Sequence, residues 1–370
     1  MDHISIASKT QADVHVSDKI DEFFSHFHIP TVLHRCGVRK RHGYTVRSWI
    51  KPIFSLPFLG KNFFRSTVIN EDLHFGKDAA YDVLKGPRSN WRRVLLTIGV
   101  RLYRFFDRLT GDDRESVLII DDSTYDRSRS KMVELLSRVK DHTTGRFIRG
   151  FRMLTLCWSD GVSCLPLDFA LLSSTDAAKR FCEGTKIVDK RCCAFERRKE
   201  ATIKSTEHLA DMVKRVLAAG IDARYILMDS WFAMPKTIVT VSQHRPVICM
   251  VKKTPNVLYG YEDRRCDLMS LYRCLKKRRG RHGFSPALSS RSQMNAGPRR
   301  FLSVTAARKT GLRCCPPIST FLTKMWFESL AVEGIRKIGS YCEKTVQSFF
   351  DMMTEAALSV RQSVKEQNHS

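Results

Sequence analysis

Two aspartates that each follow a short apolar run are the residues of this sequence best suited to chemistry. The segment SVLIIDDSTYDRSR, residues 116–129, ends an apolar strand on Asp121 and Asp122. Far along the chain, ARYILMDSWF, residues 223–232, ends a second apolar run on Asp229. Carboxylate oxygens are the hard ligands that Mg²⁺ prefers, and the ion keeps coordination positions for water and substrate. A single aspartate at a strand end is more often a turn residue, so metal binding requires a fold that brings two together.

The segments around these aspartates predict an α/β fold. In chain order they are strands at 116–122, 150–161 and 162–172, a helix at 206–220, a strand at 223–232, a helix at 235–243 and a strand at 246–253. The order β-β-β-α-β-α-β is that of a ribonuclease-H-like fold, in which the first strand and the strand after the first helix are parallel neighbours. Because parallel strands end at the same edge of a sheet, this fold brings Asp122 and Asp229 together across 107 positions.

The charge of the chain indicates a polyanionic partner. Sixty-three Lys and Arg residues against 38 Asp and Glu residues give a net charge of +25. Such an excess favours nucleic acid, because each neutralised phosphate releases condensed counterions. A protein that is basic only for solubility is the alternative. No run of eighteen apolar residues and no signal-peptide pattern is present. We therefore expect a cytoplasmic, nucleoid-associated protein without membrane contact.

Residues 1–115 are predicted to form a mostly helical, basic N-terminal DNA-binding region. Within it, residues 88–109 place apolar side chains at three- and four-residue steps, as in an amphipathic helix. The arginines of this segment lie largely off the apolar stripe, where they could contact phosphates or only face solvent. The predicted DNA-binding residues are Arg92, Arg93, Arg101 and Arg104.

Two longer stretches make the prediction specific. LIIDDSTYDRSRSKMVELLSRVKDHTTGRFIRGFRMLTLCWSDGVSCLPLDFALLSS, residues 118–174, together with YILMDSWFAMP, residues 225–235, resembles the DDE transposases of bacterial insertion sequences. The similarity is to the group with a β-strand insertion before the final glutamate. It covers about residues 116–280, which we expect to form an incomplete ribonuclease-H-like catalytic domain.

The resemblance implies a two-metal phosphoryl-transfer site. Asp122 corresponds to the first metal-binding, catalytic aspartate and Asp229 to the second, while Asp121 is expected to face away. The implied cofactor is Mg²⁺ or Mn²⁺, with one ion activating the attacking oxygen and the other stabilising the leaving oxygen. The implied partners are double-stranded DNA, as terminal inverted repeats and as target, and a second copy of the chain in a homodimeric active assembly.

The third acidic ligand is not identified. The family's Y-x2-R-x3-E-x6-K helix has no match in residues 251–370, and Glu328, Glu333 and Glu343 all lack the preceding Y-x2-R. The sixty residues from Leu268 to Phe327 include thirteen Lys or Arg residues but no Asp or Glu. Such a composition, with no periodicity, is typical of a gene read in the wrong frame. Residues 281–370 are therefore expected to be an out-of-frame basic tail, largely disordered or loosely helical.

Back-translation supports a frameshift near residues 281–300. With permitted codons, residues 308–329 read one nucleotide earlier can begin QEDWLAVLSTDIN, similar to the family's DWLAxLSTDI segment, and the shifted frame continues toward its glutamate helix. A divergent but genuine C-terminal domain is the alternative explanation. If the shift exists, sequence decay and programmed frameshifting that makes two products both stay open.

Three functions follow from these observations. The first is a transposase that cuts and joins DNA, with activity impaired by the missing third ligand. The second is a non-catalytic DNA-binding remnant that occupies the inverted repeats and competes with intact transposase. The third is an unrelated Mg²⁺-dependent nuclease on the same fold.

Overall fold

The computed structural model describes most of the chain up to Cys274. The described residues are 11–39, 43–58, 63, 66, 73–108, 116–141, 144–160, 163–185, 189–249, 251, 257–261, 264–274, 287–290 and 302–305. The described residues up to Ser89 form one compact unit, and those from Asn90 onward form a second.

The first unit is helical and is built around aromatic side chains. Phe24 and Trp49 are almost fully buried, and the Phe23 and Phe54 rings stack with centroids 5.9 Å apart. The Thr45 hydroxyl caps the third helix by accepting a hydrogen bond from the Ser48 N–H at 3.2 Å. The helices of this unit are α1 Gln11–His26, α2 Ile29–Arg35, α3 Val46–Ser55 and α4 Lys77–Leu84.

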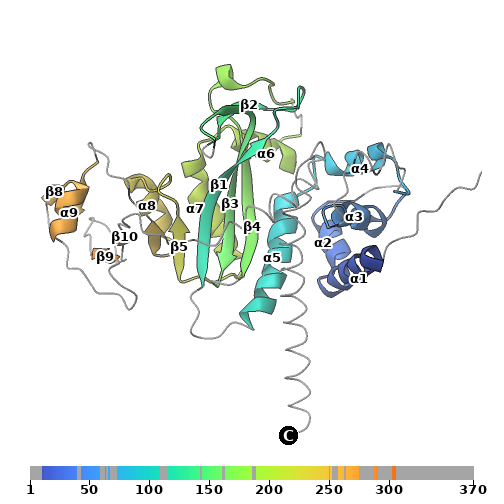
Figure 1. The fold of residues 1–370 in the computed structure, drawn as a ribbon, viewed down its shortest axis with the longest axis horizontal. Coiled ribbons are helices and arrows are strands. Elements are labelled where there is room, and N and C mark those ends of the chain that lie inside the picture. The colour runs from blue at the N-terminus through green and yellow to red at the C-terminus, as the bar shows by residue number, and fades with distance from the viewer. Residues whose placement is uncertain are drawn as a thin grey trace, which may run out of the picture. The chain divides into compact units, whose positions relative to one another are not determined.

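The second unit is centred on a mixed β-sheet with strand order β2-β3-β1-β5-β6-β10-β9, in which β4 also pairs with β3. Figure 1 shows β1, β3 and β4 side by side. The strands are β1 Val117–Asp126, β2 Ser137–Lys140, β3 Phe147–Ser159, β4 Cys164–Leu172, β5 Tyr225–Met228, β6 Val247–Cys249, β9 Ala287–Ser290 and β10 Leu302–Thr305.

The helices and smaller elements of this unit follow the same chain order. They are α5 Trp91–Asp107, the 3-10 turn η2 Ala177–Lys179, α6 Cys193–Ala201, α7 Ser205–Ala218, α8 Pro235–Ser242, the antiparallel pair β7 Tyr259–Tyr261 and β8 Arg264–Cys266, and α9 Leu268–Cys274. None of the described helices is long and apolar enough to cross a membrane.

The strand pairing confirms the central part of the predicted topology. Strand β1 is antiparallel to β3 and parallel to β5, and β5 is parallel to β6. The parallel pairs need the crossovers α7 and α8, whereas β3 and β4 are joined directly. Strand β2 and helix α6 were not predicted. The mixed sheet with its helices is consistent with a ribonuclease-H-like α/β fold.

Buried apolar side chains and one glycine hold α5 against the sheet. Leu118, Leu154 and Trp158 are fully buried in the strands, and the ring of Tyr103 in α5 meets Trp158 edge-on with centroids 5.1 Å apart. At Gly99 a Cβ atom would lie 2.6 Å from the Cδ2 atom of Leu167, so a larger residue here would require the Leu167 side chain to shift. Helix α5 therefore lies in the second unit, whereas the sequence placed it in the region before residue 116.

Two of the described strands lie within residues 281–370. Strand β10 pairs in parallel with β6 and antiparallel with β9. These two segments differ from the disordered or loosely helical state expected for this interval. The remainder of it lies outside the described residues, so the out-of-frame tail stays a prediction.

Candidate active site

The parallel register of β1 and β5 brings two aspartates to one edge of the sheet. The paired residues run from Val117 with Tyr225 to Ile120 with Met228. The residue that follows each of these paired segments is an aspartate. Asp121 still belongs to β1, and Asp229 comes directly after β5. Parallel strands end at the same edge, so these two carboxylates are neighbours although they lie far apart in sequence.

The charge of Asp229 acts directly on Asp121. Burial raises the pKa of the Asp121 carboxyl, and the negative charges of Asp122 and Asp229 raise it further, against the hydrogen bond from the Asp122 N–H. The Asp229 carboxylate accepts a hydrogen bond from the Ser230 N–H at 2.6 Å. Across the sheet Asp121 faces Thr155 of β3, whose hydroxyl donates to the Asp121 carbonyl at 3.2 Å. The partly buried Asp121 and the exposed Asp229 thus form a pair of like charges.

Asp122 lies on the opposite face of β1, which corrects part of the sequence prediction. Successive side chains of a strand alternate between faces, so Asp121 and Asp122 cannot both face Asp229. Asp122 is opposite the fully buried Leu154, and its carboxylate accepts a hydrogen bond from the Arg152 guanidinium at 2.7 Å. The Asp122 and Arg152 side chains are only 10% and 18% exposed. The expectation that Asp122 joins Asp229 while Asp121 faces away is therefore wrong.

A signal in the sequence could have identified Asp121. The runs VLII before Asp121 and YILM before Asp229 have equal length, and in each case the aspartate follows the run immediately. Aligning the two runs matches Asp121, not Asp122, with Asp229. The resemblance to the DDE transposases instead implied Asp122 as the first metal-binding aspartate.

The donor set at this edge suits a hard divalent cation. Two carboxylates at adjacent strand ends provide anionic oxygens, and a bound cation would relieve the repulsion that raises the pKa of Asp121. Within the described part of the chain, no group of three or more His, Cys, Asp and Glu side chains forms a metal-binding cluster. Glu328, Glu333 and Glu343 lie outside the described residues, so the third acidic ligand stays unidentified.

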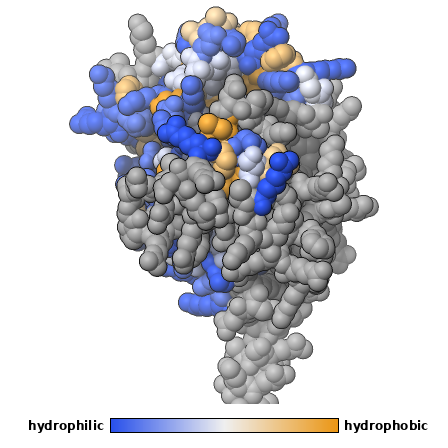
Figure 2. All heavy atoms as spheres, turned by 90° about the vertical axis from the view of Figure 1, so that its left-hand side faces the viewer, coloured by the Kyte–Doolittle hydropathy of each residue, from blue (hydrophilic) through white to orange (hydrophobic). Residues whose placement is uncertain are grey.

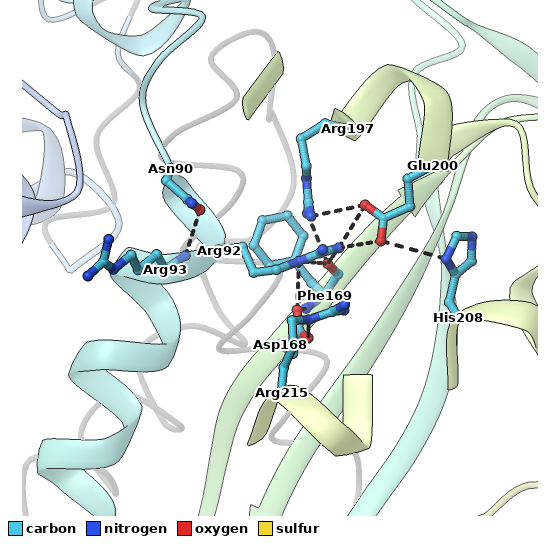
Figure 3. A network of polar contacts seen from close by, with 9 residues as sticks. All are labelled: Asn90, Arg92, Arg93, Asp168, Phe169, Arg197, Glu200, His208 and Arg215. Atoms are coloured by element: carbon cyan, nitrogen blue, oxygen red, sulfur yellow. Dashed lines mark hydrogen bonds and ion pairs between the residues drawn. The ribbon is translucent and has the colours of Figure 1, made fainter. Parts of the chain in front are cut away.

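Arg92, predicted to contact DNA, instead lies in a half-buried polar network between α5 and the sheet (Figure 3). Its Nε is 2.8 Å from a carboxylate oxygen of Asp168, which is completely buried, and its Nη2 donates to Glu200 of α6 at 2.8 Å. It also donates to the Phe169 carbonyl at 2.7 Å. The Arg92 side chain is only 15% exposed. These contacts differ from the predicted contact with DNA, because the Arg92 guanidinium already binds Asp168, Glu200 and the Phe169 carbonyl.

The rest of the network comes from helices α6 and α7. Arg197 donates to Glu200 at 3.0 Å, and Arg215 donates to Asp168 at 2.8 Å. Although burial favours the protonated form, the positive charges of Arg197 and Arg92 hold the pKa of Glu200 below its ordinary value. Burial and the charge of Arg92 lower the pKa of Arg197 to about 10. The network fastens α5, β4, α6 and α7 to one another, as Figure 3 shows.

The other predicted arginines of α5 have different surroundings. Arg93 and Arg104 are exposed, and Arg101 is half-buried. The Arg93 backbone N–H donates to the Asn90 side chain at 2.9 Å, which caps the helix. Their contact with DNA stays a prediction.

Comparison with known protein families shows a match over the segment that carries this site. The family described as DDE superfamily endonuclease matches residues 69–265, a segment that contains α4, α5, strands β1 to β6 and both aspartates. No curated protein matches the chain. The match covers more than half of the 370 residues and includes the strand pair that brings Asp121 beside Asp229. The chain therefore belongs to the DDE superfamily endonuclease family.

Proposed function

We propose that this chain is a transposase that cuts and joins the DNA ends of an insertion sequence. The observation that supports the proposal best is the pair Asp121 and Asp229 at the shared edge of β1 and β5, inside the matched segment. The proposed partner is duplex DNA, as terminal repeats and as target, and the proposed active assembly is a homodimer. The net charge of +25 suits that partner.

Asp121 and Asp229 would hold the divalent cation. A bound Mg²⁺ or Mn²⁺ supplies activation of a water or 3′-hydroxyl oxygen and stabilisation of the leaving oxygen at phosphorus. The protein's part is to fix the two carboxylates, which the strand register and the hydrogen bonds from the Asp122 and Ser230 N–H groups do. Asp122 has a supporting role, because its ion pair with Arg152 braces β1 against β3.

We further propose that the activity of this chain is low. Its sequence from Leu268 to Phe327 contains no acidic residue, and back-translation with permitted codons can place a sequence similar to the family's glutamate segment in a shifted reading frame. A site with two of three carboxylates should bind metal weakly. The second candidate function, a DNA-binding remnant that competes with intact transposase at the inverted repeats, would need no third carboxylate.

Metal binding and cleavage together test the proposal. Titration with Mn²⁺ in a calorimeter should give binding to the wild-type chain and none to Asp121→Asn or Asp229→Asn. Cleavage of a duplex that carries the DNA flanking the gene should require Mg²⁺ or Mn²⁺ and fall at least 100-fold in both variants, since each removes a metal-holding carboxylate.

Asp122→Asn is the matched control, because it removes an adjacent carboxylate on the other face of the strand. It should bind Mn²⁺ as the wild type does, once circular dichroism shows that it is folded. Loss of metal binding in Asp122→Asn with retention in Asp121→Asn would reverse the assignment. End-binding without cleavage by the wild type would favour the remnant, and equal cleavage of DNA without terminal repeats would favour the unrelated nuclease.

A further inference from the structure

The β2–β3 hairpin presents a row of cations and an aromatic ring on one face. Arg138 pairs in register with Arg149, and Lys140 pairs with Phe147. These four side chains, here called the hairpin face, are all exposed, while Ser137 and Val139 between them are buried on the opposite side. The two strands contain no acidic residue over Ser137–Lys140 and Phe147–Gly150.

Two exposed aromatic rings accompany these cations. Phe147 is 56% exposed and Phe181 is 48% exposed. The guanidinium of Arg138 lies 4.1 Å from the centroid of Phe147, and that of Arg149 lies 4.5 Å from the centroid of Phe181. Each arginine covers part of its ring and leaves the rest accessible. Figure 2 shows one face of the molecule, where apolar residues are interspersed among hydrophilic ones on the described surface.

The hairpin face continues the side of the sheet that bears Asp121. Along β3, residues 147, 149, 151, 153 and 155 share one face, because side chains alternate along a strand. Thr155 is the register partner of Asp121. From Arg149 to Thr155 the strand rises about 20 Å, at about 3.4 Å per residue. The hairpin face thus lies on the same side of the sheet as Asp121, toward the end of β1 beyond it, with the buried Phe151 and Met153 between them.

We propose that the hairpin face binds an unpaired DNA strand next to the bond that is cut, an inference that rests on the proposed function. Arg138, Lys140 and Arg149 would contact phosphates, and bases would stack on Phe147 and Phe181. Exposed rings beside cations fit single strands better than duplex, since the bases of a duplex already stack on one another while an unpaired base offers a free π-face. Arginine side chains also stack on bases and donate to phosphate.

Binding of a single strand in EDTA tests this without any cleavage. Fluorescence anisotropy with a labelled oligothymidine and with a mixed-sequence duplex gives both affinities for the full chain. Phe147→Leu should weaken binding of the oligothymidine about tenfold through lost stacking, while Phe147→Trp restores it and duplex binding changes less than twofold. Arg138→Ala and Arg149→Ala should each reduce the slope of log K against log salt by about 0.7.

Arg224→Ala is the matched control. Arg224 is also an exposed arginine over an aromatic ring, 5.6 Å from the centroid of Tyr225, but it lies at the opposite end of β5 from Asp229. It should bind both probes as the wild type does. Wild-type binding by the hairpin variants, equal losses in Arg224→Ala, or no binding of the oligothymidine by the wild type would overturn the proposal.

The two proposals fail separately. The strand-binding assay contains EDTA, so it measures the hairpin face without any metal-dependent contact. If the wild type binds no Mn²⁺ but the hairpin variants lose single-strand affinity, only the proposed catalytic function fails. If Mn²⁺ binds and the hairpin variants behave as wild type, only the hairpin inference fails.

Discussion

Asp121 and Asp229 are like charges held side by side, which works against folding in the absence of a cation. Burial and the neighbouring carboxylates raise the pKa of Asp121, so this carboxyl holds its proton more tightly in the folded chain than in the unfolded chain. A raised carboxyl pKa contributes stability only at low pH, and this contribution is lost as the pH rises through the folded-state pKa. At neutral pH the ionised pair is therefore a cost that a metal ion can remove.

Removing this charge should stabilise the protein. Asp121→Asn is expected to raise the free energy of unfolding at pH 7 by about 0.5–2 kcal/mol, the range commonly gained by a single stabilising substitution. Mn²⁺ should raise the melting temperature of the wild type and leave that of Asp121→Asn unchanged. Thermal unfolding followed by circular dichroism measures both effects.

The same substitution at the next position, Asp122, should have the opposite effect on stability. Asp122→Asn leaves the half-buried Arg152 without its charged partner, so the free energy of unfolding should fall by about 1–3 kcal/mol. If Asp121→Asn destabilises the chain as much as Asp122→Asn does, the proposed repulsion between Asp121 and Asp229 is contradicted.

At the scale of the element, α5 is held by a charged side chain as much as by apolar packing. Arg92 connects the helix to Asp168 of β4 and Glu200 of α6. Asp168 is fully buried, so it depends on Arg92 and Arg215 for compensation of its charge. The network gives this helix a fixed position on the sheet.

Loss of Arg92 should loosen α5. Arg92→Met is expected to lower the free energy of unfolding by about 3 kcal/mol, the lower end for a broken buried pair, because Arg215 and Arg197 still compensate the carboxylates. Arg93→Met, at the next and exposed position, should change it by less than about 0.5 kcal/mol. Urea unfolding of both variants measures this difference, and equal effects would contradict the role of the network.

At the scale of the whole molecule, the charge of +25 governs how the chain meets DNA. Affinity for a mixed-sequence duplex should fall about 1,000-fold between 50 and 200 mM salt, as expected for a protein that neutralises about six phosphates. Anisotropy titrations over that range give the slope. A loss of less than tenfold would mean that the excess charge serves solubility.

Much of this fold could be predicted from local pattern, and the site only in part. The apolar runs at 117–120 and 225–228 and the spacing of 206–220 identify elements that the structure contains. The four-residue strand SRVK is too short for periodicity to identify. The surroundings of Arg92 depend on Glu200, 108 positions later, so no local window could reveal them. The choice between Asp121 and Asp122 depends on the register of two strands, because one residue changes the face. The matched apolar runs before Asp121 and Asp229 indicate this register, whereas the family resemblance does not.

The parallel pairing of β1 with β5 has a consequence for the time at which the site comes into existence during synthesis. Asp121 is made 108 residues before Asp229, since 229 minus 121 is 108. At about 5–20 residues per second, a ribosome needs about 5–20 s to make that stretch. During this interval the nascent chain contains Asp121 but not yet Asp229, so the carboxylate pair cannot form. The emerging polypeptide therefore cannot gather a divalent cation between these strands until β5 has left the exit tunnel and docked beside β1.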